Sequence, residues 1–393
     1  MNNKEDIETA ETKENYDTIT FESMNLKENL LRGIFAYGFE HPSKIQAQAI
    51  IPIIQKNDII AQAQSGTGKT GTFSISSIQL VDEELKGIQT IMVCPTTVLA
   101  KQIHEACKEI GKFCKINYVL CTGGTNLTRQ DIRDMDNNPT IAICTPGKLI
   151  DMIDKNILKT NKVSMLIVDE ADEMLSFSFE NQMKIIISSI PKNSQICLFS
   201  ATIPREILEI TKKFMNDPKI ILVKQENVTL DGIKQYYVNV GQDRYKYDLL
   251  CDIYNKISIN QSIIYVNTKM KADRLKGMLL DDGFSVSVIH SDMSPLDRDN
   301  IMKDFRSGKS RILLSTDLLS RGIDVQQVSI VINYDLPNNK ECYIHRIGRS
   351  GRFGRKGVAI NFTTTDDYWK VSELSNFYDT NIEELPSDFE TNI

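Results

Sequence analysis

The segment Asp58-Ile59-Ile60-Ala61-Gln62-Ala63-Gln64-Ser65-Gly66-Thr67-Gly68-Lys69-Thr70 joins a short apolar run to a glycine-rich turn. The apolar run predicts a buried strand, and the residues that follow the turn favour a helix. A strand-to-helix turn with two glycines lets backbone N–H groups converge on phosphate oxygens. Lys69 would then hold the outer phosphates, and Thr70 would hold Mg²⁺. An ordinary glycine-rich turn is the alternative, because Ala63 stands where the pattern G-x-x-x-x-G-K-[ST] begins with glycine.

Apolar β-branched runs alternate with helical patterns along most of the chain. Two helical patterns precede the turn, one starting near Asn25 and one after Pro42-Ser43. The runs of the first half are 58–63, 90–94, 115–121, 140–144, 164–168, 195–199 and 219–223. Those of the second half are 234–240, 262–267, 284–290, 311–315, 328–334 and 358–363. This alternation predicts two α/β domains, each with a parallel sheet covered by helices.

Length and composition set the expected domain boundaries. A chain of 393 residues is too long for one ordinary core. Residues 1–20 are acidic and poor in aromatic side chains, which predicts a disordered arm. We expect the first domain over 21–224, a polar linker over 225–231 and the second domain over 232–393, with boundaries that are good to several residues.

Charge and cysteine usage narrow the class of protein. The net charge is −6, but the excess of acidic over basic residues lies at the two ends of the chain. The middle of the chain is therefore slightly basic, which is compatible with a nucleic-acid partner. The eight cysteines form no C-x-x-C pair, which argues against a zinc site or a disulfide framework. No apolar run approaches the roughly 20 residues that span a bilayer. We expect a reduced, soluble, intracellular protein.

A second polar segment follows a buried strand in the first half. The run Met165-Leu166-Ile167-Val168 leads directly into Asp169-Glu170-Ala171-Asp172. Because ligands of open α/β sheets bind outside the carboxyl ends of strands, these acids can face Lys69 and Thr70. Asp169 would hold Mg²⁺, and Glu170 would orient and deprotonate the attacking water. The alternative is an acidic helix N-terminus without a catalytic role.

Taken together, these segments resemble the DEAD-box RNA helicases. Asp169-Glu170-Ala171-Asp172 is the motif that names the family, and the resemblance covers residues 21–393. It implies two tandem RecA-like domains, each a parallel sheet with helices on both faces. It also implies ATP and Mg²⁺ as cofactors, and an RNA-dependent ATPase that unwinds RNA.

The resemblance assigns a nucleotide site that both domains share. Gln46 would recognise adenine through a donor–acceptor pair, and Phe39 would stack on the base. Arg349 and Arg352 would reach the γ-phosphate from the second domain as arginine fingers. Asp324 would contact the ribose. The phosphate loop would consist of Ser65, Gly66, Thr67, Gly68, Lys69 and Thr70.

The resemblance also assigns an RNA surface and a set of residues that couple the domains. The RNA-binding residues would be Pro95, Thr96, Gly123, Gly124, Thr145, Pro146, Gly147, Lys148, Thr316, Arg321 and Gly322. Contacts of this kind read the backbone and the 2′-OH, so we expect no sequence specificity. The coupling residues would be Ser200, Thr202, His345 and Arg346.

Four positions depart from the RNA motifs of the family. Thr97 replaces an arginine, Val98 replaces an acidic residue, Lys148 replaces an arginine, and Pro295 replaces a glutamine. Lysine keeps the charge of arginine but lacks its bidentate fork. We therefore expect the first domain to bind RNA more weakly than the motifs normally do, and we expect no reliable contact at Pro295.

Three tracts are most similar to the translation-initiation members of the family: Thr316–Pro337, Thr211–Met215 and Ile382–Asp388. This similarity implies a cytoplasmic, monomeric helicase that binds single-stranded and duplex RNA. It also implies a helical-repeat scaffold of the cap-binding complex as partner, and no membrane. One alternative, suggested by Thr97, Val98 and Pro295, is an ATP-gated RNA clamp in an mRNA-processing complex. Another is a general P-loop ATPase that acts on protein or DNA.

Overall fold

The structure of the chain is a computed structural model, and it describes residues 19–63, 66–123, 133, 135–176, 178–203, 205–222, 233–257, 259–290, 292–317, 328–348, 350 and 357–386. The expected acidic arm up to residue 18 and the expected linker 225–231 lie outside these ranges. So do seven expected site residues, which are Ser65, Gly124, Arg321, Gly322, Asp324, Arg349 and Arg352.

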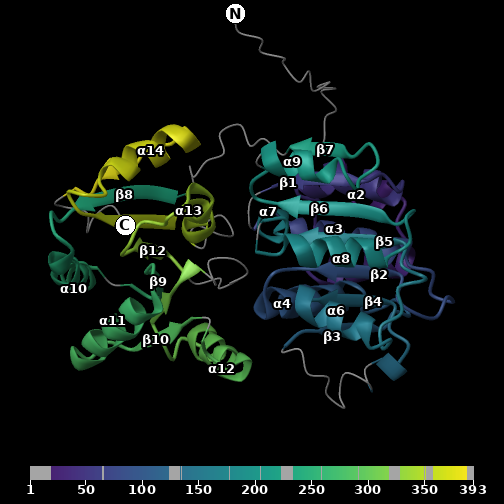
Figure 1. The fold of residues 1–393 in the computed structure, drawn as a ribbon, viewed down its shortest axis with the longest axis horizontal. Helices are drawn as coiled ribbons and strands as arrows, with labels where there is room; N and C mark the ends of the chain where they lie inside the picture. Colours follow the sequence, from purple (N-terminus) through teal and green to yellow (C-terminus); the bar gives the residue numbers. More distant parts are fainter. Residues whose placement is uncertain are drawn as a thin grey trace, which may run out of the picture.

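The first domain is built on a seven-stranded sheet in which neighbouring strands run parallel (Figure 1). In spatial order the strands are β3 (Tyr118–Cys121), β4 (Ile141–Cys144), β2 (Thr90–Val93), β5 (Met165–Asp169), β6 (Gln195–Ser200), β1 (Ile59–Gln62) and β7 (Lys219–Leu222). The central strands are buried on both faces, which explains why their interior positions are mostly apolar. All seven strands predicted for this half are confirmed.

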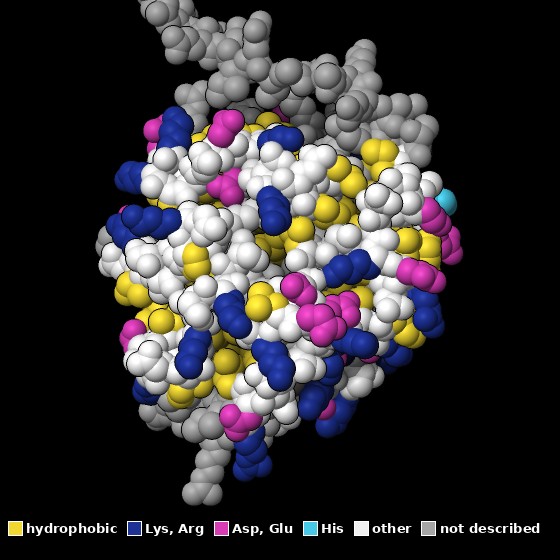
Figure 2. All heavy atoms as spheres, turned by 90° about the vertical axis from the view of Figure 1, so that its right-hand side faces the viewer, with side chains coloured by type: hydrophobic (Ala, Val, Ile, Leu, Met, Phe, Trp, Pro, Cys, Tyr) yellow, Lys and Arg dark blue, Asp and Glu magenta, His cyan; other side chains and the backbone are white. Residues whose placement is uncertain are grey.

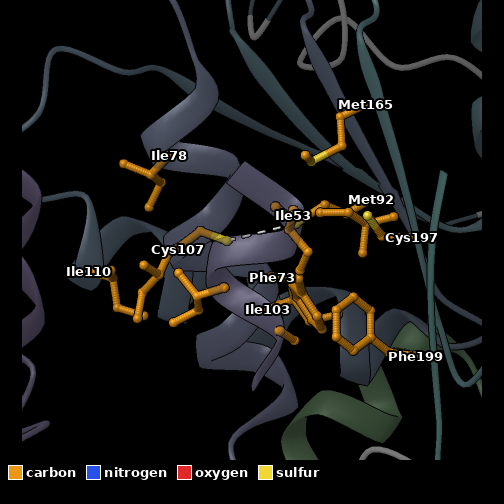
Figure 3. Close-up of a cluster of buried hydrophobic side chains, with 14 of the residues drawn as sticks. Ile53, Phe73, Ile78, Met92, Ile103, Cys107, Ile110, Met165, Cys197 and Phe199 are labelled. Carbon is orange, nitrogen blue, oxygen red and sulfur yellow. Dashed lines mark hydrogen bonds between the residues drawn. The ribbon is translucent and has the colours of Figure 1, made fainter. Parts of the chain in front are cut away.

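Helices cover both faces of the first sheet, and each face has its own hydrophobic core. The helices on one face are α1 (Glu28–Ala36), α2 (Lys44–Ile54), α3 (Lys69–Leu80) and α4 (Thr97–Ile110). Those on the other face are α6 (Pro146–Asp154), α7 (Ala171–Met174), α8 (Glu180–Ser189) and α9 (Arg205–Thr211). In Figure 3, Phe73 of α3 packs edge-on against Phe199 of β6 with ring centroids 5.2 Å apart.

The helical pattern expected near Asn25 is divided into two elements. A 3₁₀ turn, η2 (Glu22–Met24), ends at Asn25, whose φ of +58° is left-handed. This conformation interrupts the helix, so α1 begins only at Glu28. The second predicted helix starts where expected, because Ser43 forms a reciprocal capping box with Gln46 at the start of α2.

The second domain repeats the parallel architecture of the first. Its strands, in spatial order, are β10 (Val286–Ile289), β11 (Ile312–Ser315), β9 (Ser262–Tyr265), β12 (Ile330–Asn333), β13 (Gly357–Thr363), β8 (Ile233–Asn239) and β14 (Glu383–Glu384). The six predicted strands are confirmed. The two-residue β14, which pairs with β8 at the sheet edge, was not predicted because it is short, acidic and exposed.

Helices also cover both faces of the second sheet. A turn, η4 (Asp243–Tyr245), leads into α10 (Lys246–Lys256), which packs on one face with α11 (Lys269–Asp281). The other face carries α12 (Pro295–Arg306), α13 (Lys340–Ile347) and α14 (Trp369–Tyr378). The two tandem α/β domains therefore match the expected RecA-like class. No helix in the described ranges is long and apolar enough to cross a membrane.

The two domains lie side by side and touch through their functional edges (Figure 1). His345 on α13 contacts Asp172 on α7, with 3.1 Å between Nε2 and Oδ2. Val98 on α4 packs into a hydrophobic cluster of the second domain. The carboxyl end of the first sheet, where α7 follows β5, therefore faces the second domain.

Candidate active site

The glycine-rich turn follows β1 and leads into α3, and its two described glycines have left-handed backbone conformations. Gly66 and Gly68 have φ values of +83° and +106°, in the left-handed region that favours glycine. A Cβ atom on Gly68 would lie 2.7 Å from Oγ of Ser43. Both conformation and space therefore require glycine at position 68. The turn ends at the N-terminus of a twelve-residue helix, which is suited to anion binding.

Lys69 lies at the centre of this turn. Its side chain is 6% exposed, and its ammonium group donates a hydrogen bond of 2.7 Å to the carbonyl oxygen of Ala63. The bond ties the ammonium group of Lys69, at the start of α3, to the backbone at Ala63, just after β1. Thr70 follows it in the first turn of α3 and is partly exposed. The ammonium group and the hydroxyl group thus stand together at the end of β1.

Asp169 ends β5 and is buried close to Lys69. Burial, together with the neighbouring carboxylate of Glu170, raises the pKa of Asp169 to about 7, and the positive charge of Lys69 opposes this shift. The carboxylate of Asp169 and the hydroxyl of Thr70 are hard oxygen ligands of the kind that Mg²⁺ prefers. These residues therefore fit the expected Mg²⁺ site.

The raised pKa of Asp169 predicts how the stability of the ligand-free protein depends on pH. The folded chain keeps this proton up to about pH 7, whereas the unfolded chain releases it near 3.8. Stability should therefore fall as pH rises between these values, by up to about 1.4 kcal/mol per pH unit. Asp169→Asn removes the titrating group and should flatten this dependence. Urea unfolding at pH 5 and pH 7.5 checks the prediction, and equal slopes for the two proteins would contradict it.

Glu170 occupies an unusual backbone position beside Asp169. Its φ is +53°, in the left-handed region, and its backbone N–H donates to Oδ1 of Asp169 at 3.0 Å. The residue is 4% exposed and immediately precedes α7. A non-glycine residue in this conformation costs free energy, which the surrounding packing must offset. The strain places the Glu170 side chain at the end of β5, at the interface with His345.

Gln46 and Phe39 lie against the glycine-rich turn. The side-chain oxygen of Gln46 accepts from the backbone N–H of Ser43 at 2.8 Å, and its amide nitrogen lies 3.5 Å from the carbonyl oxygen of Gly68. Gln46 is only 2% exposed, so it is not an ordinary surface residue of α2. A Cβ atom on Gly71 would lie 2.6 Å from the amide nitrogen of Gln46 and 2.8 Å from the Phe39 ring. These residues therefore share one tightly packed edge of the turn.

Gly71→Ala should test this edge. The added methyl group must displace the Gln46 amide or the Phe39 ring, because both lie closer than any real Cβ contact allows. We expect about tenfold weaker ATP binding and less preference for ATP over GTP. Fluorescence competition with labelled ATP measures both. Gly147→Ala is the matched control, because no atom lies within 4 Å of a Cβ atom at that position.

Asp172, Ser200 and Thr202 form a hydrogen-bonded group at the domain interface. Oδ2 of Asp172 accepts from the hydroxyl of Thr202 at 2.8 Å and lies 3.1 Å from Nε2 of His345. The backbone N–H of Asp172 donates to the Ser200 hydroxyl at 3.4 Å, and that of Thr202 donates to the same hydroxyl at 3.3 Å. Three of the four expected coupling residues therefore meet at Asp172, with Thr202 and His345 at its carboxylate and Ser200 at its backbone N–H.

Arg346, the fourth expected coupling residue, is placed differently. It is fully buried, and among the described residues its hydrogen-bond partners lie within the second domain. They are Asp317 at 2.6 Å, the carbonyl oxygen of Asp335 at 2.6 Å, Asn333 at 3.3 Å and Asn267 at 2.9 Å. Its guanidinium also stacks over the Tyr265 ring. These contacts join the strand ends of its own domain, so they do not support the expectation that Arg346 bridges the domains.

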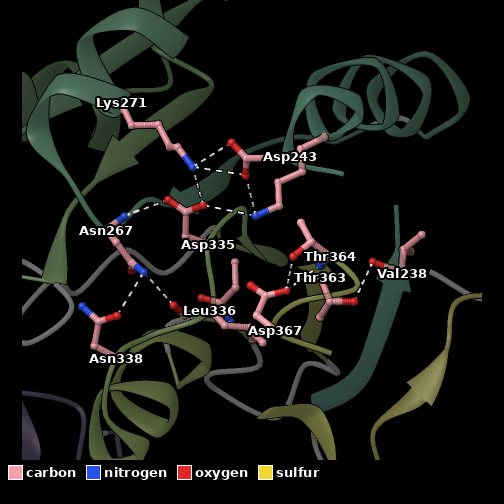
Figure 4. A network of polar contacts seen from close by, with 12 residues as sticks. Val238, Asp243, Asn267, Lys271, Asp335, Leu336, Asn338, Thr363, Thr364 and Asp367 are labelled. Atoms are coloured by element: carbon pink, nitrogen blue, oxygen red, sulfur yellow. Dashed lines mark hydrogen bonds and ion pairs between the residues drawn. The ribbon is translucent and has the colours of Figure 1, made fainter. Parts of the chain in front are cut away.

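Arg346 contacts Asn267 and the carbonyl oxygen of Asp335, and both residues belong to a polar network of the second domain. Figure 4 shows this network around Asp335. Asp335 accepts from Lys271 at 2.8 Å and from the nearly buried Lys246 at 3.2 Å, and both lysines also pair with Asp243. The backbone N–H of Asn267 donates to the other carboxylate oxygen of Asp335. Our interpretation of the sequence missed this network. Its available signal was the presence of polar residues directly after buried strands, at Asn267, Asp317 and Asp335.

The described residues of the expected RNA surface lie at the carboxyl ends of strands. Thr96 caps α4 by accepting from the N–H of Leu99, and Pro146 opens α6. Gly123 has a φ of +103°, which favours glycine, and Thr316 directly follows β11. Pro95, Thr145 and Gly147 flank the same helix starts. Lys148 differs from expectation, because it is 2% exposed and does not present its charge to solvent.

The outer face of the first domain shows a different character. In Figure 2, lysine and arginine side chains on this face are interspersed with acidic ones, and apolar side chains are scattered among them. Such a mixed surface creates no strong field for a polyanion. We therefore expect RNA to bind at the carboxyl edge of the sheet, where the helices begin.

Comparison with known proteins bears on this site. Residues 43–210 match the DEAD/DEAH box helicase family, and residues 245–354 match the helicase conserved C-terminal domain. The ATP-dependent RNA helicase eIF4A of Neosartorya fischeri is 53% identical over 384 residues, which cover 97% of this chain and 96% of that protein. A match to an RNA helicase over nearly the whole chain does not favour the alternative of an ATP-gated RNA clamp.

Two solved structures resemble the whole chain. Dbp5 of S. cerevisiae bound to RNA and ADP BeF3 aligns with a TM-score of 0.88 and 35% identity, covering 95% of this chain and 97% of that one. Mss116p bound to ssRNA and AMP-PNP aligns with a TM-score of 0.83 and 26% identity, covering 96% and 81%. The likeness extends over both domains, so their arrangement here resembles that of chains which hold RNA and nucleotide.

Proposed function

This chain belongs to the DEAD/DEAH box family of ATP-dependent RNA helicases, and we propose that it opens short RNA duplexes during translation initiation. One observation carries the proposal. The Asp172 carboxylate joins Thr202 of the first domain to His345 of the second, beside the group formed by Lys69, Asp169 and Glu170. A nucleotide site at this place is completed only when the domains meet, so ATP hydrolysis depends on closure.

The residues of the first domain divide the chemistry among themselves. Lys69 exchanges its bond to Ala63 for the outer phosphates of ATP, and the N–H groups at the start of α3 face the phosphate oxygens. Thr70 and Asp169 would hold Mg²⁺, which would neutralise charge on the phosphates. Glu170 accepts a proton from the attacking water. Gln46 and Phe39 contact the adenine.

The second domain supplies the remaining groups. Arg349 and Arg352, which follow α13, would stabilise charge on the transferred phosphoryl group, and Asp324 would contact the ribose. Arg346 fixes α13 by its contacts with Asp317 and Asn267. His345 on the same helix is thereby held toward Asp172.

RNA binding is assigned to the helix starts at the carboxyl edges of both sheets. Thr96, Gly123 and Thr145 in the first domain and Thr316 in the second lie at such edges. Backbone N–H groups there suit phosphate oxygens, and this mode of binding reads no sequence. We also assign Gly124, Arg321 and Gly322 to this surface. Lys148 is buried, so we assign it only an indirect role in RNA binding.

The cellular setting is also part of the proposal. The similarity to eIF4A proteins favours a cytoplasmic monomer that works on messenger leaders. Its partner would be a helical-repeat scaffold of the cap-binding complex. Co-purification with that scaffold from a cell extract tests this assignment separately from the catalytic one.

The catalytic proposal is tested by RNA-stimulated ATP hydrolysis together with the release of a strand from a short duplex. We expect both activities from the natural chain, a preference for RNA over DNA in competition binding, and neither activity from Glu170→Gln. Slow RNA release with ATP but no strand separation would instead indicate a clamp.

Thr97→Arg should strengthen RNA binding. Thr97 is the first residue of α4 and is partly exposed, so an arginine there can reach a backbone phosphate. One added phosphate contact should steepen the slope of log K against log salt by about 0.7 for a single strand. Fluorescence anisotropy between 50 and 300 mM salt measures the slope. Thr97→Gln, which has a long side chain but no charge, should leave the slope unchanged.

A further inference from the structure

A hydrophobic cluster of the second domain includes a residue of the first domain. Its buried members in the described ranges are Val98 on α4 and eight residues of the second domain, which are Ile263, Tyr265, Ile289, Met302, Phe305, Leu313, Val328 and Val331. Val98 is 7% exposed, and Met302 on α12 is 3% exposed. The second domain therefore covers the Val98 side chain, which loses this cover when the domains part.

The neighbours of Val98 anchor α4 in the first domain. Leu99 and Ala100 belong to the hydrophobic core of the first domain, and Thr96 caps the helix through the N–H of Leu99. Consecutive residues of one helical turn are therefore buried in different domains. Because Thr96 also lies at the edge assigned to RNA, this rigid turn connects that edge directly to the second domain.

The contact between Val98 and Met302 borders an open groove between α4 and α12. The groove has a volume of about 460 Å³, and its lining includes Lys101, Glu105, Lys303 and Arg306. Val98 and Met302 also line the groove, and both belong to the apolar cluster. Moderate salt weakens phosphate contacts but does not weaken apolar burial.

We infer that Val98 is a positioning residue that favours closure of the two domains by packing into the cluster around Met302. The inference rests on the proposed function, since closure matters for hydrolysis only where both domains complete the nucleotide site. Burying a valine side chain can shift a two-state equilibrium by about tenfold. Val98 thus lowers the amount of RNA that is needed to hold the closed, hydrolytic state.

The test measures the RNA dependence of ATP hydrolysis in the full chain. Val98→Asp places a charge in the apolar cluster and should raise the RNA concentration for half-maximal hydrolysis at least tenfold. Val98→Ala should raise it about threefold. At saturating RNA, kcat should stay within about twofold for both variants, because RNA can still drive closure. Ile185→Asp on α8 is the control, because Ile185 is 49% exposed and takes no part in the cluster.

Small-angle scattering with AMP-PNP and oligouridylate measures closure without hydrolysis. We expect compaction of the natural chain and of Ile185→Asp, at RNA concentrations where Val98→Asp stays extended. Circular dichroism melting without ligands should be the same for the two aspartate variants. Equal RNA dependence for Val98→Asp and the control would overturn the inference, as would equal compaction. If the natural chain shows no RNA-stimulated hydrolysis, the proposed function fails, and the scattering result alone decides the role of Val98.

Discussion

Glu170→Gln is expected to lower the rate of ATP hydrolysis by about 10² to 10⁴, the range typical of losing a general base. Glutamine has nearly the same shape as glutamate, but it cannot accept the proton of the attacking water. The backbone N–H at position 170, which donates to Asp169, is unchanged by the substitution. The loss should therefore appear in kcat, with ATP and RNA affinity retained.

The rate of hydrolysis at saturating ATP and RNA gives kcat and therefore measures this loss directly. Glu180→Gln is the matched control, because Glu180 lies on the exposed surface of α8, where it pairs with Lys184. That variant should hydrolyse ATP at the natural rate. If Glu170→Gln kept more than a tenth of the rate, another group would have to accept the proton.

Arg346→Met is expected to destabilise the second domain by about 3 to 5 kcal/mol, as happens when one partner of a buried charged group is removed. The guanidinium is fully buried and joins the ends of β9, β11 and β12 through Asn267, Asp317 and Asn333. Methionine fills part of the space but satisfies none of these polar groups. The destabilisation should be confined to one domain.

Urea unfolding of Arg346→Met should show two transitions, and only the transition of the second domain should shift to lower urea concentration. Arg346→Lys should fall between the two proteins, because it keeps the charge but not the planar fork. Arg244→Met is the control and should change stability by less than about 0.5 kcal/mol, since Arg244 is exposed and contacts only the exposed ring of Tyr245 among the described residues. A single unshifted transition in Arg346→Met would contradict the role assigned to this residue.

The sheets could be predicted because buried parallel strands leave a strong mark on the sequence. Runs such as Ile91–Val93 and Ile141–Cys144 are apolar at every position, since helices cover both of their faces. Weak elements left no such mark. The start of α1 was displaced because Asn25 turns left-handed, and β14 consists of two exposed glutamates.

Within the site, the sequence predicted which residues take part, but it did not predict which atoms those residues contact. The motifs predicted that Lys69 and Asp169 face each other, and in the structure they lie at the carboxyl ends of β1 and β5, which are separated in the sheet by β6. They did not reveal that Gln46 is already bonded to its own chain, or that Lys148 is buried. Those facts depend on how helices pack across the sheet edge. Similarly, the resemblance assigned Arg346 to coupling between the domains, but only the fold shows that its described partners lie in its own domain.

The hydrogen bond from Lys69 to Ala63 determines how the ligand-free turn behaves. A buried lysine that is already fixed has given up the rotamer freedom, up to about 2 kcal/mol, that ordering it would otherwise cost on binding. If Lys69 holds the outer phosphates as proposed, nucleotide binding would exchange one partner of its ammonium group for another, and the side chain would not first have to be ordered.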